Sequence, residues 1–198
     1  GGSSDERGRR ILHAKNGDYF VLATTNSREI TPALDNGVDP WLIRMKNSGK
    51  LVSQYIHSEG TVRFRDIIES TDDSIYLAGN DYSLNEALLV KLNSNLELDW
   101  KATISVPDIP EKFVLRNLVE LNGKLIATGY ELNTIDGFYR RGAWHILTLT
   151  TTGEIESTTQ IENFEGVKIN DISNVFLDRE NNILLAGSAI PESADHNG

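Results

Sequence analysis

Cysteine is absent from the 198 residues of this chain, which excludes disulfide bonds, thiolate chemistry and metal sites built on cysteine. Positive charge is scarce: 19 Lys and Arg stand against 29 Asp and Glu, for a formal net charge of −10. Nucleic acids and anionic membrane surfaces select for basic patches, so the composition argues against both as partners. No apolar run approaches the roughly 20 residues that a membrane-spanning helix needs, so we expect no membrane insertion.

What the sequence does contain is an internal repeat. Four apolar runs end in a pair of small residues, and each follows a turn of Asn, Asp or Gly and another apolar segment. Asn-Gly and similar pairs tolerate the positive φ of tight hairpin turns. When the ends of the runs are taken as equivalent positions, the copies are spaced at about 50 to 60 residues. These ends are Thr24, Gly79, Gly129 and Gly187.

The first three runs are each followed by a second hairpin, in which apolar and polar residues alternate. The segments 42–55, 89–100 and 146–158 carry this alternation, and a period of two residues is typical of half-buried strands. No stretch has a convincing helical period. One unit is therefore expected to be four short antiparallel strands, A to D in chain order.

Units of this size and strand count are typical of β-propeller blades. We predict an all-β fold, a β-propeller of four-stranded antiparallel blades, with a twisted two-sheet sandwich as the alternative. The fourth copy stops after strand B, so about three and a half blades are expected: part of a longer propeller, a ring completed by a second copy, or an open arc. Open blade edges predict association, including a homodimer. The repeats are predicted near 9–57, 62–105, 113–161 and 169–198, within a single domain over 9–198.

The opening residues 1–8 are small, polar and acidic. We expect them to be disordered, as a linker or the remnant of a tag. Such an opening is also typical of a bacterial lipoprotein without its lipidated cysteine, which would place a lipid anchor upstream of residue 1.

The best copy runs from Ile67 to Trp100 and contains Leu89-Val90-Lys91-Leu92 before the tryptophan. This pattern resembles the bacterial delta-60 repeats, which are common in secreted and lipid-anchored proteins of Bacteroides-type bacteria. The resemblance covers most of residues 9–190. It implies a propeller fold and an extracytoplasmic location in the cell envelope, either in the periplasm or as an outer-membrane lipoprotein. The class has no common catalytic residues, so the resemblance assigns none to this chain.

Binding residues tend to lie on long loops held by a rigid frame, and the loop between strands B and C is predicted to be long at 131–142. Aromatic rings beside paired arginines can stack on a sugar or clamp a carboxylate. The alternative is that the aromatics pack onto neighbouring blades and the arginines are solvated. The candidate ligand-binding residues are Asp136, Phe138, Tyr139, Arg140, Arg141 and Trp144.

Segment 26–40 is the other long loop between strands B and C, with Asp35, Asp39 and Trp41 as candidate ligand-binding residues. Its carboxylates could hold Ca²⁺, but their spacing does not match the twelve-residue calcium loop, and a turn needs no metal. We therefore predict no metal site. Trp41 and Trp144 are expected in equivalent positions at the entry of strand C, which favours packing between blades.

Strand A of each copy carries a polar residue just before its apolar pair. In a propeller this strand faces the central channel, so these residues would line it. Binding of water and anchoring of loops is the expected role. The four residues are Arg10, Asp66, Asn117 and Asn174.

The sequence shows no catalytic constellation. Its histidines lack metal-ligand spacing, and there is no nucleophile elbow, phosphate loop or dinucleotide fingerprint. We therefore predict a non-catalytic extracytoplasmic binding or interaction module without a cofactor, whose ligand is a glycan, a peptide or a partner protein. Two alternatives stay open: a carbohydrate-active propeller enzyme, hydrolase or lyase, whose site needs further blades, and a purely structural repeat domain.

Overall fold

Every regular element in the described part of the chain is a β-strand. Fourteen strands there form four antiparallel sheets, and no helix occurs in it that is long and apolar enough to cross a membrane. The predicted all-β fold of antiparallel strands is confirmed. The chain divides into two compact units, residues 1–104 and 105–198, and one domain over 9–198 stays a prediction. The computed structural model describes residues 2–27, 29–30, 38–107, 109, 112–161, 163 and 166–191.

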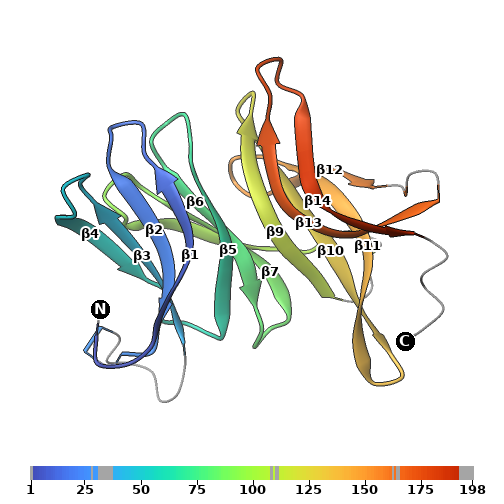
Figure 1. Ribbon diagram of the computed structural model, residues 1–198, viewed down its shortest axis with the longest axis horizontal. Helices are drawn as coiled ribbons and strands as arrows, with labels where there is room; N and C mark the ends of the chain where they lie inside the picture. The colour runs from blue at the N-terminus through green and yellow to red at the C-terminus, as the bar shows by residue number, and fades with distance from the viewer. Residues whose placement is uncertain are drawn as a thin grey trace. The chain divides into compact units, whose positions relative to one another are not determined.

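The first unit holds two four-stranded sheets in which consecutive strands are neighbours (Figure 1). Their apolar faces share one core, where Phe20 and Leu22 from one sheet and Leu77 and Val90 from the other are almost fully buried. Each such side chain contributes about 1.5–3 kcal/mol on burial. The strands are β1 (Glu6–His13), β2 (Tyr19–Thr25), β3 (Asp39–Met45), β4 (Leu51–Ile56), β5 (Val62–Glu69), β6 (Ile75–Asp81), β7 (Glu86–Leu92) and β8 (Leu98–Ile104).

The second unit holds one four-stranded sheet and one two-stranded sheet. Its core cluster joins Tyr130 and Trp144 of the larger sheet to Ile172 of the smaller one. The strands are β9 (Lys112–Leu121), β10 (Lys124–Ile135), β11 (Phe138–Leu149), β12 (Ile155–Gln160), β13 (Val167–Leu177) and β14 (Ile183–Pro191).

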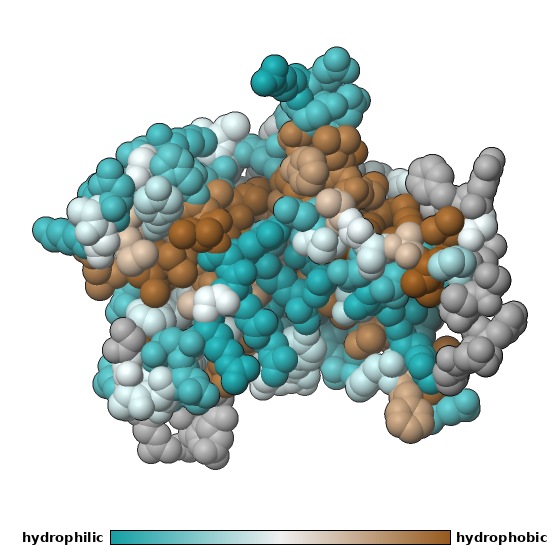
Figure 2. All heavy atoms as spheres, viewed as in Figure 1, coloured by the Kyte–Doolittle hydropathy of each residue, from teal (hydrophilic) through white to brown (hydrophobic). Residues whose placement is uncertain are grey.

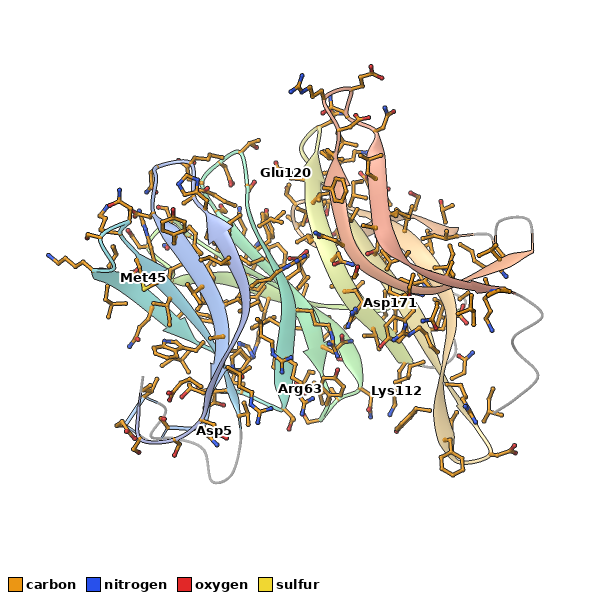
Figure 3. The ribbon with its side chains drawn as sticks, in the orientation of Figure 1. Asp5, Met45, Arg63, Lys112, Glu120 and Asp171 are labelled. Atoms are coloured by element: carbon orange, nitrogen blue, oxygen red, sulfur yellow. The ribbon has the colours of Figure 1, made fainter. Side chains whose placement is uncertain are left out.

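Strand β1 begins at Glu6, so the expectation of disorder over residues 1–8 is wrong for its last three residues. The reason is backbone pairing, because Glu6 pairs with Thr25 and Gly8 with Ala23. The backbone N–H of Asp5, labelled in Figure 3, also donates to Asn26 Oδ1 at 2.8 Å.

The predicted turns between strands A and B are confirmed by their backbone angles. Positive φ occurs in this turn in every copy: at Gly17, at Asp73, at Asn122 and Gly123, and at Asn181. Glycine, asparagine and aspartate reach this left-handed region at low cost. These turns can therefore be predicted from the sequence.

The hairpin pairing corrects the alignment of the first repeat by one residue. The turn hydrogen bonds Ala14 N–H to Asp18 O and Ser70 N–H to Ser74 O, both 2.8 Å, close the first two turns in the same way. Strand B starts directly after each turn, so Ala23 rather than Thr24 is the counterpart of Gly79. The equivalent pairs across strands B and C are Ala23–Trp41, Gly79–Leu88 and Gly129–His145.

Strand A of every sheet contains a β-bulge at the same point of the repeat. One extra residue enters opposite the small residue that ends the apolar run of strand B. A bulge bends its strand and increases the local twist, so its recurrence shows that the four copies share one backbone design. The extra residues are Arg9, Arg65, Arg116 and Ser173.

In both units, polar residues that follow a bulge link neighbouring sheets. In the first unit, Arg10 Nε donates to Asp66 Oδ1 at 2.8 Å. In the second, Asn117 Nδ2 donates to Thr128 Oγ1 at 3.0 Å and to the carbonyl oxygen of Ile172 at 3.3 Å. These contacts connect the sheets inside each unit. That the four residues line a common channel stays a prediction.

Candidate binding site

The segment predicted as a long loop over 131–142 is instead a continuous β-hairpin. Strands β10 and β11 pair without a loop as far as Ile135 and Phe138, and the turn between them is only Asp136-Gly137, with φ of 52° and 78°. Asp-Gly with two positive φ values is the favoured two-residue hairpin turn. The prediction was wrong because this turn chemistry outweighs the irregular composition around it.

A bulge in the hairpin separates its base from its tip. Tyr130 pairs with Trp144 and Leu132 with Arg141, so β11 has one residue more than β10 between these pairs. Side chains two residues apart on a strand share a face. One face of the hairpin therefore carries Tyr130, Leu132, Arg141 and Trp144.

Arg141 covers the aromatic base of this face. Its guanidinium carbon lies 4.5 Å from the centre of the Tyr130 ring and 5.7 Å from that of Trp144, and the two rings lie 5.0 Å apart. Arg141 Nη1 also donates to Asp171 Oδ1 on β13 at 2.9 Å and to the carbonyl oxygen of Asn170. Stacking and ion pairing together fix the guanidinium between the two sheets of this unit (Asp171 is labelled in Figure 3).

A pocket of about 290 Å³ opens beside this stack. The backbone brings its walls together, since the N–H of Ile161 donates to the carbonyl oxygen of Trp144 at 2.7 Å at the end of β12. The pocket is lined by Arg141, Gly142, Ala143, Trp144, Gln160, Ile161, Asn163, Lys168 and Ile169.

The indole N–H of Trp144 is buried without an acceptor among the described residues. Trp144 as a whole is 2% exposed, so the chain around it leaves little room for bulk water. A buried donor without a partner costs about 1–3 kcal/mol. The residues that line the pocket thus include Trp144, two cationic side chains, Arg141 and Lys168, and two amides, Gln160 and Asn163.

The other candidates of this segment do not join the pocket. Phe138 and Tyr139 are 68% and 61% exposed near the hairpin turn, and Arg140 is exposed on the face opposite Arg141. Lys112 Nζ lies 4.5 Å from the centre of the Tyr139 ring and donates to its hydroxyl at 2.7 Å. Asp136 serves as a turn residue. Of the six predicted residues, the structure brings only Arg141 and Trp144 together.

Two candidate residues of the predicted loop 26–40 and the start of strand C, Asp39 and Trp41, have buried side chains. Asp39 is 2% exposed and starts β3, and Trp41 is 9% exposed. The indole Nε1 of Trp41 donates to Gln54 Oε1 at 3.1 Å. Asp35 lies outside the described residues, so the calcium alternative for this loop is not tested by the structure.

Trp41 and Trp144 are not equivalent, which corrects the expectation that they share one position. Trp41 corresponds to His145 of the third copy, because each pairs with the small residue that ends the apolar run of strand B. Trp144 comes one residue earlier, and successive side chains of a strand point to opposite faces. The two tryptophans therefore face opposite sides of their sheets.

Three polar residues of the pocket, and a tyrosine beside it, were missed by sequence reasoning. Gln160 is the last residue of β12, Asn163 follows this strand and Lys168 is the second residue of β13, all in segments without any distinctive motif. Tyr130 lies in the stack under Arg141. In the sequence it is only the residue after an apolar run. The pairing of β10 with β11 across a bulge brings Tyr130 beside Trp144, and the sequence carried no signal for that bulge.

The first unit has a second pocket, of about 470 Å³, between the β4–β5 connection and the β6–β7 loop. His57 lines it, and the Tyr55 hydroxyl lies 2.8 Å from His57 Nδ1. Burial, with a smaller contribution from Lys101, holds the pKa of His57 below its usual value. Burial also raises the pKa of Tyr55 to about 12, so its hydroxyl is protonated at neutral pH.

The charged side chains of this second pocket already have partners. Lys101 forms an ion pair with Glu59. Burial opposes the ionisation of Asp81, but hydrogen bonds from Ser83 and from backbone amides outweigh it and lower the pKa of that carboxyl. Among the described residues, no three His, Asp or Glu side chains gather as a metal site requires.

Comparison with known proteins gives a distant structural similarity. No family model matches the chain, and no curated protein matches it. The native arabinanase Arb43A of Bacillus subtilis shares 16% sequence identity with a TM-score of 0.46, over 80% of this chain and 60% of that one. The chain thus spans about 60% of the length of that structure.

Proposed function

We propose that this chain is a segment of a β-propeller that binds an acidic glycan, without catalysis, in the pocket beside Arg141 and Trp144. The pocket lining carries the proposal, because Arg141, Lys168, Gln160 and Asn163 gather there beside Trp144. A ligand oxygen that reached the unpaired indole N–H of Trp144 would also recover the cost of burying that donor. A carboxylate also matches the planar donor fork of Arg141.

The remaining lining residues favour a sugar as the carrier of that carboxylate. Gln160 and Asn163 line the pocket, and an amide offers both donors and an acceptor, which suits an array of hydroxyl groups. The volume of about 290 Å³ lies near the lower end of the range for small-molecule sites. That size fits one sugar residue rather than a folded partner.

The test is a binding measurement with a matched pair of glycans. We expect oligogalacturonate to bind in isothermal titration calorimetry and to change the tryptophan fluorescence, and neutral galacto-oligosaccharide to bind at least about tenfold more weakly, which corresponds to roughly 1.4 kcal/mol. Trp144→Phe, which deletes the N–H, and Arg141→Met are both expected to weaken oligogalacturonate binding by a similar factor.

Arg140→Met is the matched control, because Arg140 is the neighbouring arginine on the opposite, exposed face. It removes the same charge and is expected to leave affinity unchanged. If Arg141→Met and Arg140→Met weaken glycan binding equally, the loss of affinity comes from the change in net charge. An acidic peptide that binds in place of the glycan, or cleavage of the glycan, would replace this function by a peptide-binding or an enzymatic one. The absence of any binding would favour a purely structural repeat.

The propeller itself belongs to this proposal. Four sheets with equivalent bulges, turns and strand order support radial repetition. An experimental structure that shows the sheets as two facing layers would overturn it. The delta-60 resemblance, the extracytoplasmic location in the cell envelope and association through open edges are proposed with it, and cell fractionation tests the location.

A further inference from the structure

The two-stranded sheet leaves one side of β14 without a neighbour among the described residues. In the other three sheets, strand B lies between strand A and strand C: β2, β6 and β10 each pair on both sides. β14 pairs only with β13. In an antiparallel sheet, alternate residues of a strand direct their N–H and C=O groups to each side, so half of the backbone groups of β14 face away from β13.

Side chains on β14 are exposed where their counterparts in a complete sheet are buried. Leu185 is 37% exposed and Leu184 40%, whereas the equivalent residues of β6, Leu77 and Tyr76, are both 0% exposed. Phe176 on β13 is 43% exposed. Figure 2 shows apolar side chains at the surface over the upper part of this hairpin. Apolar edge strands of this kind are templates for pairing with another strand.

The complete sheets show what fits this edge. Strand C of the second copy, β7, runs antiparallel to β6 and places apolar residues at alternate positions against it. Leu88, Val90 and Leu92 pair with Gly79, Leu77 and Ile75 in that register, and all three are at most 5% exposed. Residues 192–198, which lie outside the described residues, contain only one apolar residue, Ala194, and cannot supply this pattern.

We propose that β14 is a docking edge for a β-hairpin of the repeat's own strands C and D, supplied by a polypeptide segment other than residues 1–198. The first strand of that hairpin pairs antiparallel with β14 and places apolar residues opposite Ile183, Leu185 and Gly187. Main-chain hydrogen bonds then supply affinity and the alternate apolar side chains supply the register. The inference rests on the association through open edges proposed above, and it does not depend on the glycan pocket.

Hydrogen exchange with a synthetic hairpin tests the inference directly. The probe is a peptide with the sequence of residues 86–104, which are β7 and β8 of this chain. We expect it to slow exchange of alternate backbone amides of β14 by at least roughly tenfold, with the amides of β12, an outer edge strand of the same unit, unaffected.

Two variants make the test specific. Replacing Val90 by Lys in the peptide puts a charge opposite Leu185 and is expected to abolish the protection, without any change to the chain. Leu185→Lys in the chain should do the same, with Thr158→Lys on the exposed edge strand β12 as the control that keeps it. The absence of peptide-induced protection overturns the inference. So does protection of β14 that is already present without peptide, and concentration dependence would then identify a second copy as the occupant.

Discussion

Gly79 lies so close to the backbone of Arg63 that a Cβ at this position would be 2.2 Å from the Arg63 carbonyl oxygen and 2.7 Å from the Cα of Phe64. Gly129 and Gly187 meet strand A in the same way, at 2.5 Å from Val114 O and 1.9 Å from Asp171 O. In these three copies the glycine that ends the apolar run of strand B therefore fits tightly against the backbone of strand A beside its bulge. The first copy has Ala23 at this position, opposite Gly8.

Gly79→Ala is expected to destabilise the first unit by about 2–4 kcal/mol, because rigid backbone atoms must move to admit the methyl group. Gly8→Ala is the control, since a Cβ there meets no atom within 4 Å and the effect should stay near the ordinary strand value of roughly 1 kcal/mol or less. Urea unfolding of both variants measures the difference. If the two variants have equal free energies of unfolding, strand A moves at the bulge to admit the methyl group.

The repeat, the strands and the turns could be predicted because they depend on local chemistry. Alternation and turn residues such as Asn122-Gly123 act within a few positions of the chain. The alignment of Thr24 with Gly79 failed by one residue because both Ala23 and Thr24 are small, and only the hairpin pairing tells them apart.

The candidate site could be predicted only in part, because it depends on non-local contacts. Arg141 and Trp144 were found from their residue types, whereas Lys168 reaches the same pocket through the pairing of a different sheet. The segment around Asp136 reads as a loop in composition, yet its Asp-Gly turn closes a hairpin. A bulge and a sheet-to-sheet contact leave no periodic signal in one sequence.

Leu96 occupies a left-handed turn position, with φ of 66°, where the other two copies have Gly49 and Gly153. It is 3% exposed and belongs to the core of the first unit. Left-handed backbone costs a residue with a side chain about 1–2 kcal/mol, and burial of leucine contributes roughly 1.5–3 kcal/mol. The burial outweighs the strain.

Leu96→Gly is therefore expected to lower the free energy of unfolding by only about 1 kcal/mol, far less than a core leucine usually loses. Gly49→Ala isolates the strain, because a Cβ there has no atom within 4 Å while φ is 83°. We expect it to cost about 1 kcal/mol. Chemical denaturation measures both, and a loss above roughly 3 kcal/mol for Leu96→Gly would mean that the backbone strain is negligible.

Asp72 makes stability depend on pH in the acid range. Burial opposes its ionisation, but hydrogen bonds from Ser74 and Lys91 outweigh it and lower the pKa to about 2. The ordinary value is 3.8, so the folded state binds the proton more weakly than the unfolded chain. This stabilisation is complete above the unfolded pKa and is lost as the pH falls from about 4 towards 2.

Asp72→Asn should remove that part of the acid loss, because asparagine can still accept the Ser74 N–H bond (3.0 Å in the structure) but does not titrate. Lys91→Met removes the ammonium group 3.3 Å from Asp72 Oδ2 and should reduce the acid loss partially. Thermal unfolding at pH 5, 4, 3 and 2 tests both. If the melting temperature falls with pH equally in the unmodified protein and in both variants, the acid loss comes from other carboxylates.

The tip and the base of the β10–β11 hairpin are expected to differ sharply in their contribution to stability. Trp144 is 2% exposed and packs against Tyr130 and Ile172, so Trp144→Ala should cost about 3–5 kcal/mol. Tyr139→Ala combined with Arg140→Ala removes exposed side chains near the turn, where substitutions usually change stability by no more than about 0.5 kcal/mol. Differential scanning calorimetry of the two proteins measures the contrast. A large loss from the double tip variant would show that Tyr139 is buried against another part of the protein, and its contact with Lys112 would then be the first to examine.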